Sequence, residues 1–154
     1  MATFSAILPD ELMNEFKKVY DNTEKIFGAM TRAGAEAALS KAKMKAPNTI
    51  APYGKLTRTY RTPTDGGINT KVIFTGYVPF SEGRKEFKRR NKVGGKVYTT
   101  SKGVPVDFLA TLYEYGRSTS PFPKIPFLRQ AFSGAEIEKA MLRAQKEASG
   151  GLLE

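Results

Sequence analysis

The side chains that could carry out chemistry in this chain of 154 residues are carboxylates, hydroxyls and amines, because it contains neither histidine nor cysteine. There is thus no imidazole base near neutral pH, no thiolate nucleophile and no histidine or cysteine ligand for zinc. Magnesium bound by carboxylates survives this exclusion, but its candidate ligands Asp65, Asp107 and Glu114 are too scattered to predict a cluster. We therefore expect a protein that is not an enzyme and that holds neither a metal ion nor a cofactor.

Basic side chains are concentrated in one segment. The formal net charge of the chain is +10, and between Ser81 and Lys102 eight Lys or Arg residues face two Glu, a local net charge of +6. The basic residues are Arg84, Lys85, Lys88, Arg89, Arg90, Lys92, Lys96 and Lys102. Three interpretations stay open: contact with nucleic acid, docking on an acidic protein surface, or a solvated hairpin. Phe87 and Tyr98 flank the cluster, and aromatic rings among basic side chains can stack on bases.

A second concentration of special residues is the stretch 109–132, LATLYEYGRSTSPFPKIPFLRQAF. Gly116 is predicted to adopt a backbone conformation denied to residues with a Cβ, here between a strand and a polar loop. The three prolines of the loop reduce the entropy that is lost when it orders. Phe122, Ile125 and Phe127 are expected to anchor the loop to the core. The pattern predicts a bend held in one rigid shape.

Glu114 stands between two tyrosines and close in sequence to Arg117 and Arg129. Within one chain its carboxylate could form an ion pair or accept hydrogen bonds from loop amides. Between two subunits it could form an ion pair across an interface. Both interpretations stay open.

A long helix is predicted at the N-terminus. Apolar and small residues recur every three or four positions from residue 10 to residue 45, and Ala46-Pro47 follows as a stop. Gly28 and Gly34 weaken the middle of this helix by about 1 kcal/mol each, so a kink or break is conceivable there. The small residues of segment 33–38 would let a sheet or a second helix approach closely.

The rest of the chain reads as short strands and a final helix. Segments 56–60 and 68–80 flank a Pro-Thr-Asp-Gly-Gly turn and predict a hairpin. Segment 81–104 is predicted to be a long hairpin, or a loop that orders on binding. The apolar run that follows is predicted to form a helical turn near 108–112 and then a strand. Helical turns are predicted again from Pro126, and Ser133 with Glu136 is typical of the cap of a C-terminal helix.

The predicted fold class is α+β. A long N-terminal helix and a C-terminal helix would pack on a small antiparallel sheet with the basic excursion 81–104, all in one domain spanning 1–154, with a frayed tail at 149–154. No apolar run approaches the ~20 residues of a membrane span. Residues 1–11 do not read as a secretory signal, which predicts a protein made and kept in a cytoplasm.

Two separated motifs resemble those of the phage tail-completion family, the head–tail joining proteins of long-tailed phages. The first is Tyr113-Glu114-Tyr115-Gly116, a Ser/Thr loop, and then Pro126-Phe127-Leu128-Arg129 with Ala131-Phe132. The second is an Ala-rich helix that ends in Ala46-Pro47 and is followed by Gly54 and Leu56. The chain departs from the family pattern at Arg117, where many members carry Thr or Asn, and at Gln130, where many carry Pro.

The resemblance implies a structural role in the virion, with assembly in the host cytoplasm. Such a protein completes the tail end so that it can join the DNA-filled head, and proteins of this region commonly form rings around the DNA path. The expected partners are other copies of the chain and neck and tail proteins, namely the terminator, the head-closure protein and the tail tube, with contact to genomic DNA in the lumen as a further expectation. The expected interface residues are Glu114, Tyr115, Gly116, Arg117, Pro126, Phe127 and Arg129. No catalysis, cofactor or membrane is implied.

Two other functions remain as alternatives. A tail terminator or head-closure protein would occupy the same neck, with a similar size and fold class. A free-standing protein that binds nucleic acid without sequence preference would explain the basic excursion, and its binding would weaken strongly with salt.

Overall fold

The computed structural model describes residues 10–64, 66–90, 95–117, 122–132 and 134–149, and its longest element is the N-terminal helix. This helix, α1 (Asp10–Lys45), has 36 residues and is therefore about 54 Å long. It is continuous through both of its glycines, so the break considered from the sequence is absent from this helix. Where the burial of its residues is described, the buried ones are small: Gly34, Ala35, Ala38 and Ala42, with Ala46 just beyond its end.

The strands form two interrupted hairpins, each made of an outer and an inner antiparallel pair. The pairs of the first are β1 (Gly54–Leu56) with β4 (Val72–Phe74) and β2 (Tyr60–Arg61) with β3 (Ile68–Asn69). The pairs of the second are β5 (Tyr77–Val78) with β8 (Val104–Pro105) and β6 (Phe87–Arg90) with β7 (Val97–Thr100). The expected hairpins are confirmed, but the small sheet consists of four separate two-stranded ladders.

The remaining elements are three helices and a single turn. They are η1 (Ala51–Tyr53), α2 (Val106–Tyr115), α3 (Phe127–Ala131) and α4 (Ala135–Ser149). The mixed α+β class with long helices at both ends is therefore confirmed. The expected cap residue Ser133 lies outside the described residues, as does the tail beyond Ser149, which ends α4.

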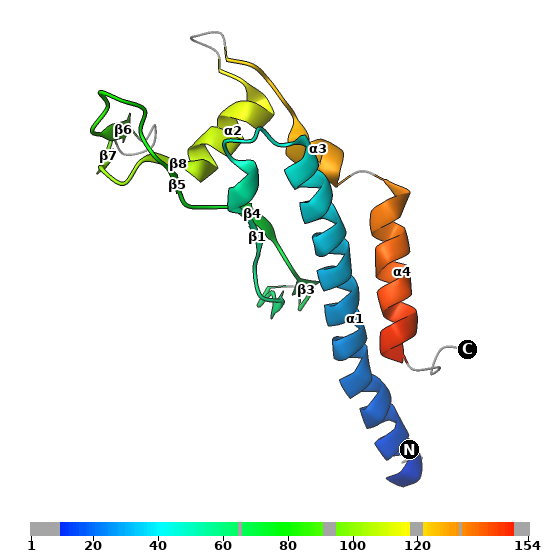
Figure 1. Ribbon diagram of the computed structural model, residues 1–154. Helices are drawn as coiled ribbons and strands as arrows, with labels where there is room; N and C mark the ends of the chain where they lie inside the picture. The colour runs from blue at the N-terminus through cyan, green and yellow to red at the C-terminus, as the bar shows by residue number, and fades with distance from the viewer. Residues whose placement is uncertain (1–9, 65, 91–94, 118–121, 133, 150–154) are drawn as a thin grey trace, which may run out of the picture.

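Figure 1 shows the first hairpin beside α1, α4 alongside α1 on the side away from the strands, and the second hairpin projecting from the body. In detail, α4 thus packs on the long helix and not on the strands. Gly34 makes this packing close, since a Cβ at that position would lie 2.9 Å from Met141 Cγ. Lys41 and Glu136 add an ion pair of 3.1 Å between the two helices.

The main core lies where the end of α1, β4, α2 and α3 meet. Its buried members are Ala42, Ala46, Ile50, Phe74, Val106, Ala110, Phe127 and Ala131. The rings of Phe74 and Phe127 meet edge to face, with centroids 5.1 Å apart, a geometry that aromatic pairs favour. The core therefore joins segments that are far apart in the sequence.

The prediction for segment 106–115 was wrong in its second half, because residues 113–115 are helical and not a strand. The buried residues of α2 are Val106, Ala110 and Glu114, each one helical turn after the previous one. Because the third of these buried positions is occupied by the charged Glu114, the spacing of the apolar residues alone does not show the helical period. The expected turn at 108–112 is one part of this longer helix.

Candidate functional site

The stretch 109–132 folds into a corner, which we define as residues 113–117 and 122–129. Its centre is the carboxylate of Glu114, of which only 1% is exposed. Oε2 accepts a hydrogen bond from the backbone N–H of Leu128 at 2.9 Å, and Oε1 accepts one from the N–H of Arg129 at 3.2 Å. Arg129 Nε also donates to Oε1, at 3.1 Å. Glu114 thus caps α3, whose preceding residue Pro126 makes no side-chain cap.

Opposing effects set the ionisation of Glu114. Burial disfavours the charged form and by itself would raise the pKa of this carboxyl. The hydrogen bonds from the amides of Leu128 and Arg129 and from the Arg129 guanidinium favour the charged form and together outweigh burial, so the pKa of Glu114 lies below its usual value. The carboxylate is therefore held ionised and in place at neutral pH. The intrachain interpretation of Glu114 is confirmed.

Arg129 links this buried carboxylate to the surface. Its guanidinium lies over the ring of Tyr115, with 5.1 Å from the guanidinium carbon to the ring centroid. Tyr115 is 65% exposed, so the ring and the guanidinium together form a stacked polar and aromatic surface. The fixed position of Glu114 therefore also fixes what the corner presents to solvent.

Gly116 ends α2 with φ 79° and ψ −173°, a conformation that is almost confined to glycine. The predicted positive φ is confirmed, but the glycine follows a helix and not a strand. Its N–H donates to the carbonyl of Leu112 at 2.7 Å. Nearby, the N–H of Ile125 donates to the carbonyl of Tyr113, also at 2.7 Å, so the returning chain is tied to the helix by its backbone.

The expected anchors of the loop behave differently from one another. Phe127 is fully buried in the core, and the ring of Phe122 lies 4.9 Å from that of Tyr113. The expectation that Ile125 also anchors the loop was wrong, because its side chain is 38% exposed. Its backbone hydrogen bond takes over that role. The hydroxyls at 118–120 and Pro121 lie outside the described residues.

The expected interface residues therefore divide into three groups by their exposure. Glu114 and Phe127 are buried and position the corner, while Gly116 and Pro126 are half-buried. Tyr115, Arg117 and Arg129 are exposed and are the ones a partner could reach. Three exposed apolar side chains at the same end of the molecule were missed: Met44, Ile125 and Phe132. Exposure of an apolar residue leaves no mark in the local sequence, so no pattern could have found them.

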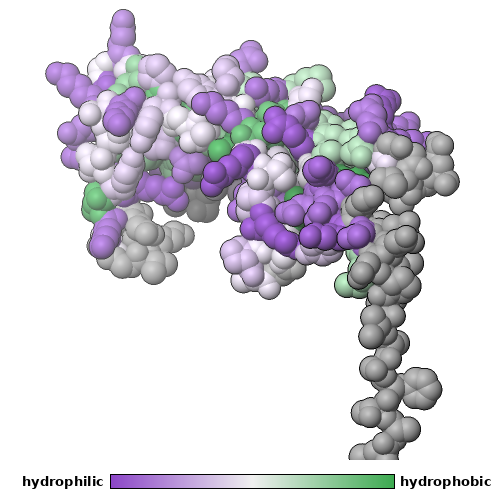
Figure 2. Space-filling view, turned by 90° about the horizontal axis from the view of Figure 1, so that it is seen from below, coloured by the Kyte–Doolittle hydropathy of each residue, from purple (hydrophilic) through white to green (hydrophobic). Residues whose placement is uncertain are grey.

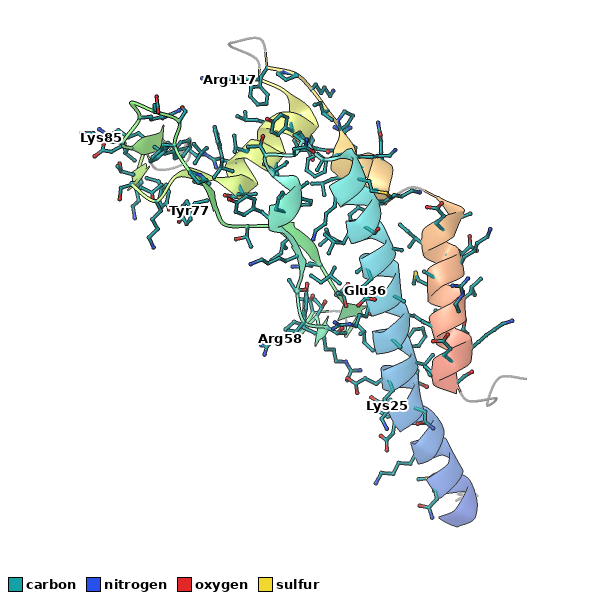
Figure 3. All side chains as sticks on the ribbon, in the orientation of Figure 1. Lys25, Glu36, Arg58, Tyr77, Lys85 and Arg117 are labelled. Carbon is teal, nitrogen blue, oxygen red and sulfur yellow. The ribbon has the colours of Figure 1, made fainter. Side chains whose placement is uncertain are left out.

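The basic excursion belongs to the second hairpin, which we call the arm and define as residues 77–90 and 95–105. Figure 3 shows Tyr77 near its base, Lys85 toward its far end, and Arg117 at the opposite end of α2. Arg84, Lys85, Lys88, Arg89, Lys96 and Lys102 are all exposed. The side chain of Arg90 and residue Lys92 lie outside the described part of the structure. A hairpin, and not an irregular loop, carries the charge.

Several cations of the arm are held by neighbouring groups. The Arg84 guanidinium lies 5.9 Å from the ring centroids of both Phe80 and Phe87, and that of Arg89 lies 5.1 Å from the centroid of Phe108. Lys88 pairs with Glu86 at 3.1 Å. Phe87 is buried and packs against Phe108 of α2, with ring centroids 5.1 Å apart and ring planes tilted by 60°. The arm is therefore docked on the N-terminal half of α2.

The hydrophobic surface visible from below is broken into small patches among hydrophilic side chains (Figure 2). Among the described residues no group of three carboxylates lies close enough to hold a metal ion, and Asp65 is outside that set. No helix in the same ranges is long and apolar enough to cross a membrane.

Comparisons of the chain with protein-family models, curated proteins and solved structures found no match.

Proposed function

We propose that the protein is a structural component of the neck of a long-tailed phage, where it completes the tail end and joins it to the DNA-filled head as part of a ring. One observation carries this proposal. The two motifs that resemble the tail-completion family are more than 50 residues apart in the sequence, yet their residues lie in the same core. Phe127 and Ala131 from the first motif and Ala46 from the second are buried in one cluster.

Further contacts tie the two motifs together. A Cβ on Gly54 would lie 3.0 Å from atoms of both Leu39 and Phe74, and Phe74 packs on Phe127. Lys45 Nζ donates to Gln130 Oε1 at 3.0 Å, between the end of α1 and α3. The two motifs, although far apart in the sequence, are therefore packed together and hold the corner in one shape.

Such a corner suits a ring. Every subunit of a ring must present the same surface to its neighbour, so the surface has to be fixed before assembly. The buried Glu114 and the Gly116 turn supply that rigidity, and Tyr115, Arg117 and Arg129 supply exposed contact groups. We assign these three exposed side chains to the interface with a neighbouring subunit or neck protein.

The first experiment is to measure the mass of the purified protein by light scattering, alone and mixed with the tail-tube, terminator and head-closure proteins of the phage that encodes it. The proposal expects a defined ring, or a monomer that forms one with these partners. The identity of the protein that binds separates tail completion from the terminator and head-closure roles. If the protein stays monomeric, binds none of these proteins and binds DNA instead, the proposal is contradicted.

The interface assignment has its own variant. Arg117→Glu reverses an exposed charge at the corner and is expected to lower ring or complex formation at least tenfold. Arg143→Glu makes the same change on the exposed face of α4 and is the matched control. If both variants assemble equally well, the corner is not part of the interface. That result would not bear on the neck role itself, which the light-scattering experiment tests.

A further inference from the structure

We propose that an open pocket between the arm and the start of α2 binds one base of a single-stranded nucleic acid, whose phosphates lie on the lysines of the arm. This inference goes beyond the proposed neck role and does not depend on it. The pocket has a volume of about 460 Å³, enough for a nucleobase. Its main lining residues are Tyr77, Phe87, Arg89, Tyr98, Pro105 and Asp107.

The strand register of the arm explains why these side chains converge. Arg89 pairs directly with Tyr98, and Phe87 pairs with Thr100. Because paired residues share a face and neighbours along a strand alternate, Phe87, Arg89 and Tyr98 point to the same side of the hairpin. Lys88, paired with Thr99, points to the other side. One face of the arm is thus aromatic and basic, and it is the face that lines the pocket.

The aromatic wall of the pocket is held in place but not covered. The hydroxyls of Tyr77 and Tyr98 are hydrogen-bonded at 3.1 Å, which joins the base of the arm to β7. Tyr98 is nevertheless 50% exposed. An exposed ring of fixed orientation beside cations is what non-specific binders of single strands use to stack a base.

The charges inside the pocket favour a base over an anionic group. Arg89, held over the ring of Phe108, offers hydrogen-bond donors, and the carboxylate of Asp107 offers acceptors. A nucleobase carries both donors and acceptors on its edges and can satisfy both side chains. A phosphate or the carboxylate of an acidic peptide would meet repulsion from Asp107. The base therefore enters the pocket and the phosphates stay outside it.

The exposed lysines of the arm suit those phosphates. Lys85, Lys96 and Lys102 are all exposed on the arm. Neutralising phosphates with such side chains releases counterions, so the affinity should fall steeply as salt increases. The pocket would add a contribution that salt does not remove.

The test is fluorescence anisotropy with a labelled DNA 12-mer of mixed sequence, its duplex, and the RNA strand of the same sequence. The wild-type protein is expected to bind a single strand more tightly than the duplex, and the better of the DNA and RNA strands identifies the natural ligand. Tyr98→Ala and Arg89→Gln are each expected to weaken single-strand binding about tenfold. Tyr98→Phe keeps the ring and should change binding less than about twofold.

Lys88→Gln is the matched control, since it removes one charge from the opposite face of the same strand. It should weaken binding only about twofold, for the duplex and the single strand alike. Circular dichroism melting of each variant verifies that the arm and body remain folded. Equal effects of Arg89→Gln and Lys88→Gln, or equal affinity of the wild type for single strand and duplex, would overturn the proposal. So would a polyglutamate peptide that binds with the same dependence on Tyr98.

Discussion

The corner and the arm each contain a carboxylate in an ion pair with an N–O distance of 3.1 Å, yet the two carboxylates have different roles. Glu86 in the arm is 53% exposed in its side chain and pairs with a lysine that is also exposed. Glu114 in the corner is 2% exposed in its side chain and also accepts two backbone hydrogen bonds. The distance within an ion pair therefore says little about how much the pair contributes to stability. Burial and additional hydrogen-bond partners decide that contribution.

The same difference separates the two regions as a whole. The corner is joined to the main core, and its exposed groups are oriented by buried ones. The arm is attached to α2 mainly through Phe87 and Arg89 on the ring of Phe108. We therefore expect changes in the corner to affect the whole protein and changes in the arm to remain local.

The largest effect is expected from Glu114→Ala. The amides of Leu128 and Arg129 would lose their acceptor, and the free energy of unfolding should fall by about 3 kcal/mol. The exposed Arg129 contributes little to that figure because solvent screens its charge. Urea denaturation measures the change. Glu86→Ala in the arm is the control and should change stability by less than about 0.5 kcal/mol. Similar losses for both variants would abolish the distinction between the regions.

The next effect in size is that of Gly116→Val. A β-branched residue is forced into a conformation almost confined to glycine, so the free energy of unfolding should fall by about 2 kcal/mol. Gly95→Val places the same side chain at another positive φ, 65°, in the arm, and should lower global stability less because the arm can rearrange locally. Thermal melting compares the two. A wild-type melting temperature for Gly116→Val would refute the rigid corner.

Lowering the pH should remove part of the contribution that Glu114 makes to the free energy of unfolding. Its folded-state pKa is lowered, so its stabilisation is complete above the unfolded-state pKa of about 4.3 and is lost as the pH falls through the lower folded-state value. The stability difference between wild type and Glu114→Gln should therefore be largest at neutral pH and should shrink below about pH 4. Urea denaturation at several pH values measures it. For Glu86→Gln the difference should stay small throughout, and a Glu114 difference independent of pH would contradict the assigned ionisation.

The smallest global effect is expected from Phe87→Ala, although this residue is buried. Removing its ring loosens the arm from α2 and leaves the main core intact, so global stability should fall by roughly 1 kcal/mol or less. Hydrogen exchange should show β6 and β7 amides exchanging at least tenfold faster while those of α1 are unchanged. Tyr98→Ala removes a half-exposed ring and its hydrogen bond to Tyr77, and it should leave global stability unchanged and speed the exchange of the β6 and β7 amides less than Phe87→Ala does. A cooperative loss of protection in α1 would mean that the arm is part of the core.

Much of the fold was predictable because local sequence patterns determine where most of its helices and turns form. The spacing of small and apolar residues predicted α1 to its end, and the turn residues predicted the first hairpin, whereas segment 81–104 was predicted as either a hairpin or a loop. The helix at 106–115 was only half predicted, since Glu114 occupies its buried face and local patterns treat a charged residue as exposed. The site shows the same limit: the unusual conformation of Gly116, the intrachain partners considered for Glu114 and the concentration of charge in the arm could be predicted, but not the exposure of Ile125, Phe132 and Met44.

Four features follow from the amino-acid sequence alone: the types of side chain available, the helix and hairpin propensities, the positive φ at Gly116 and the concentration of charge between 81 and 102. These are properties of residue types and of neighbours along the chain. Only the tertiary structure decided that Glu114 caps α3, that the motifs around Ala46 and Phe127 share one core, and that Arg89, Tyr98 and Asp107 surround one pocket. Each of these depends on long-range packing, which brings together groups whose separation in the sequence gives no local signal.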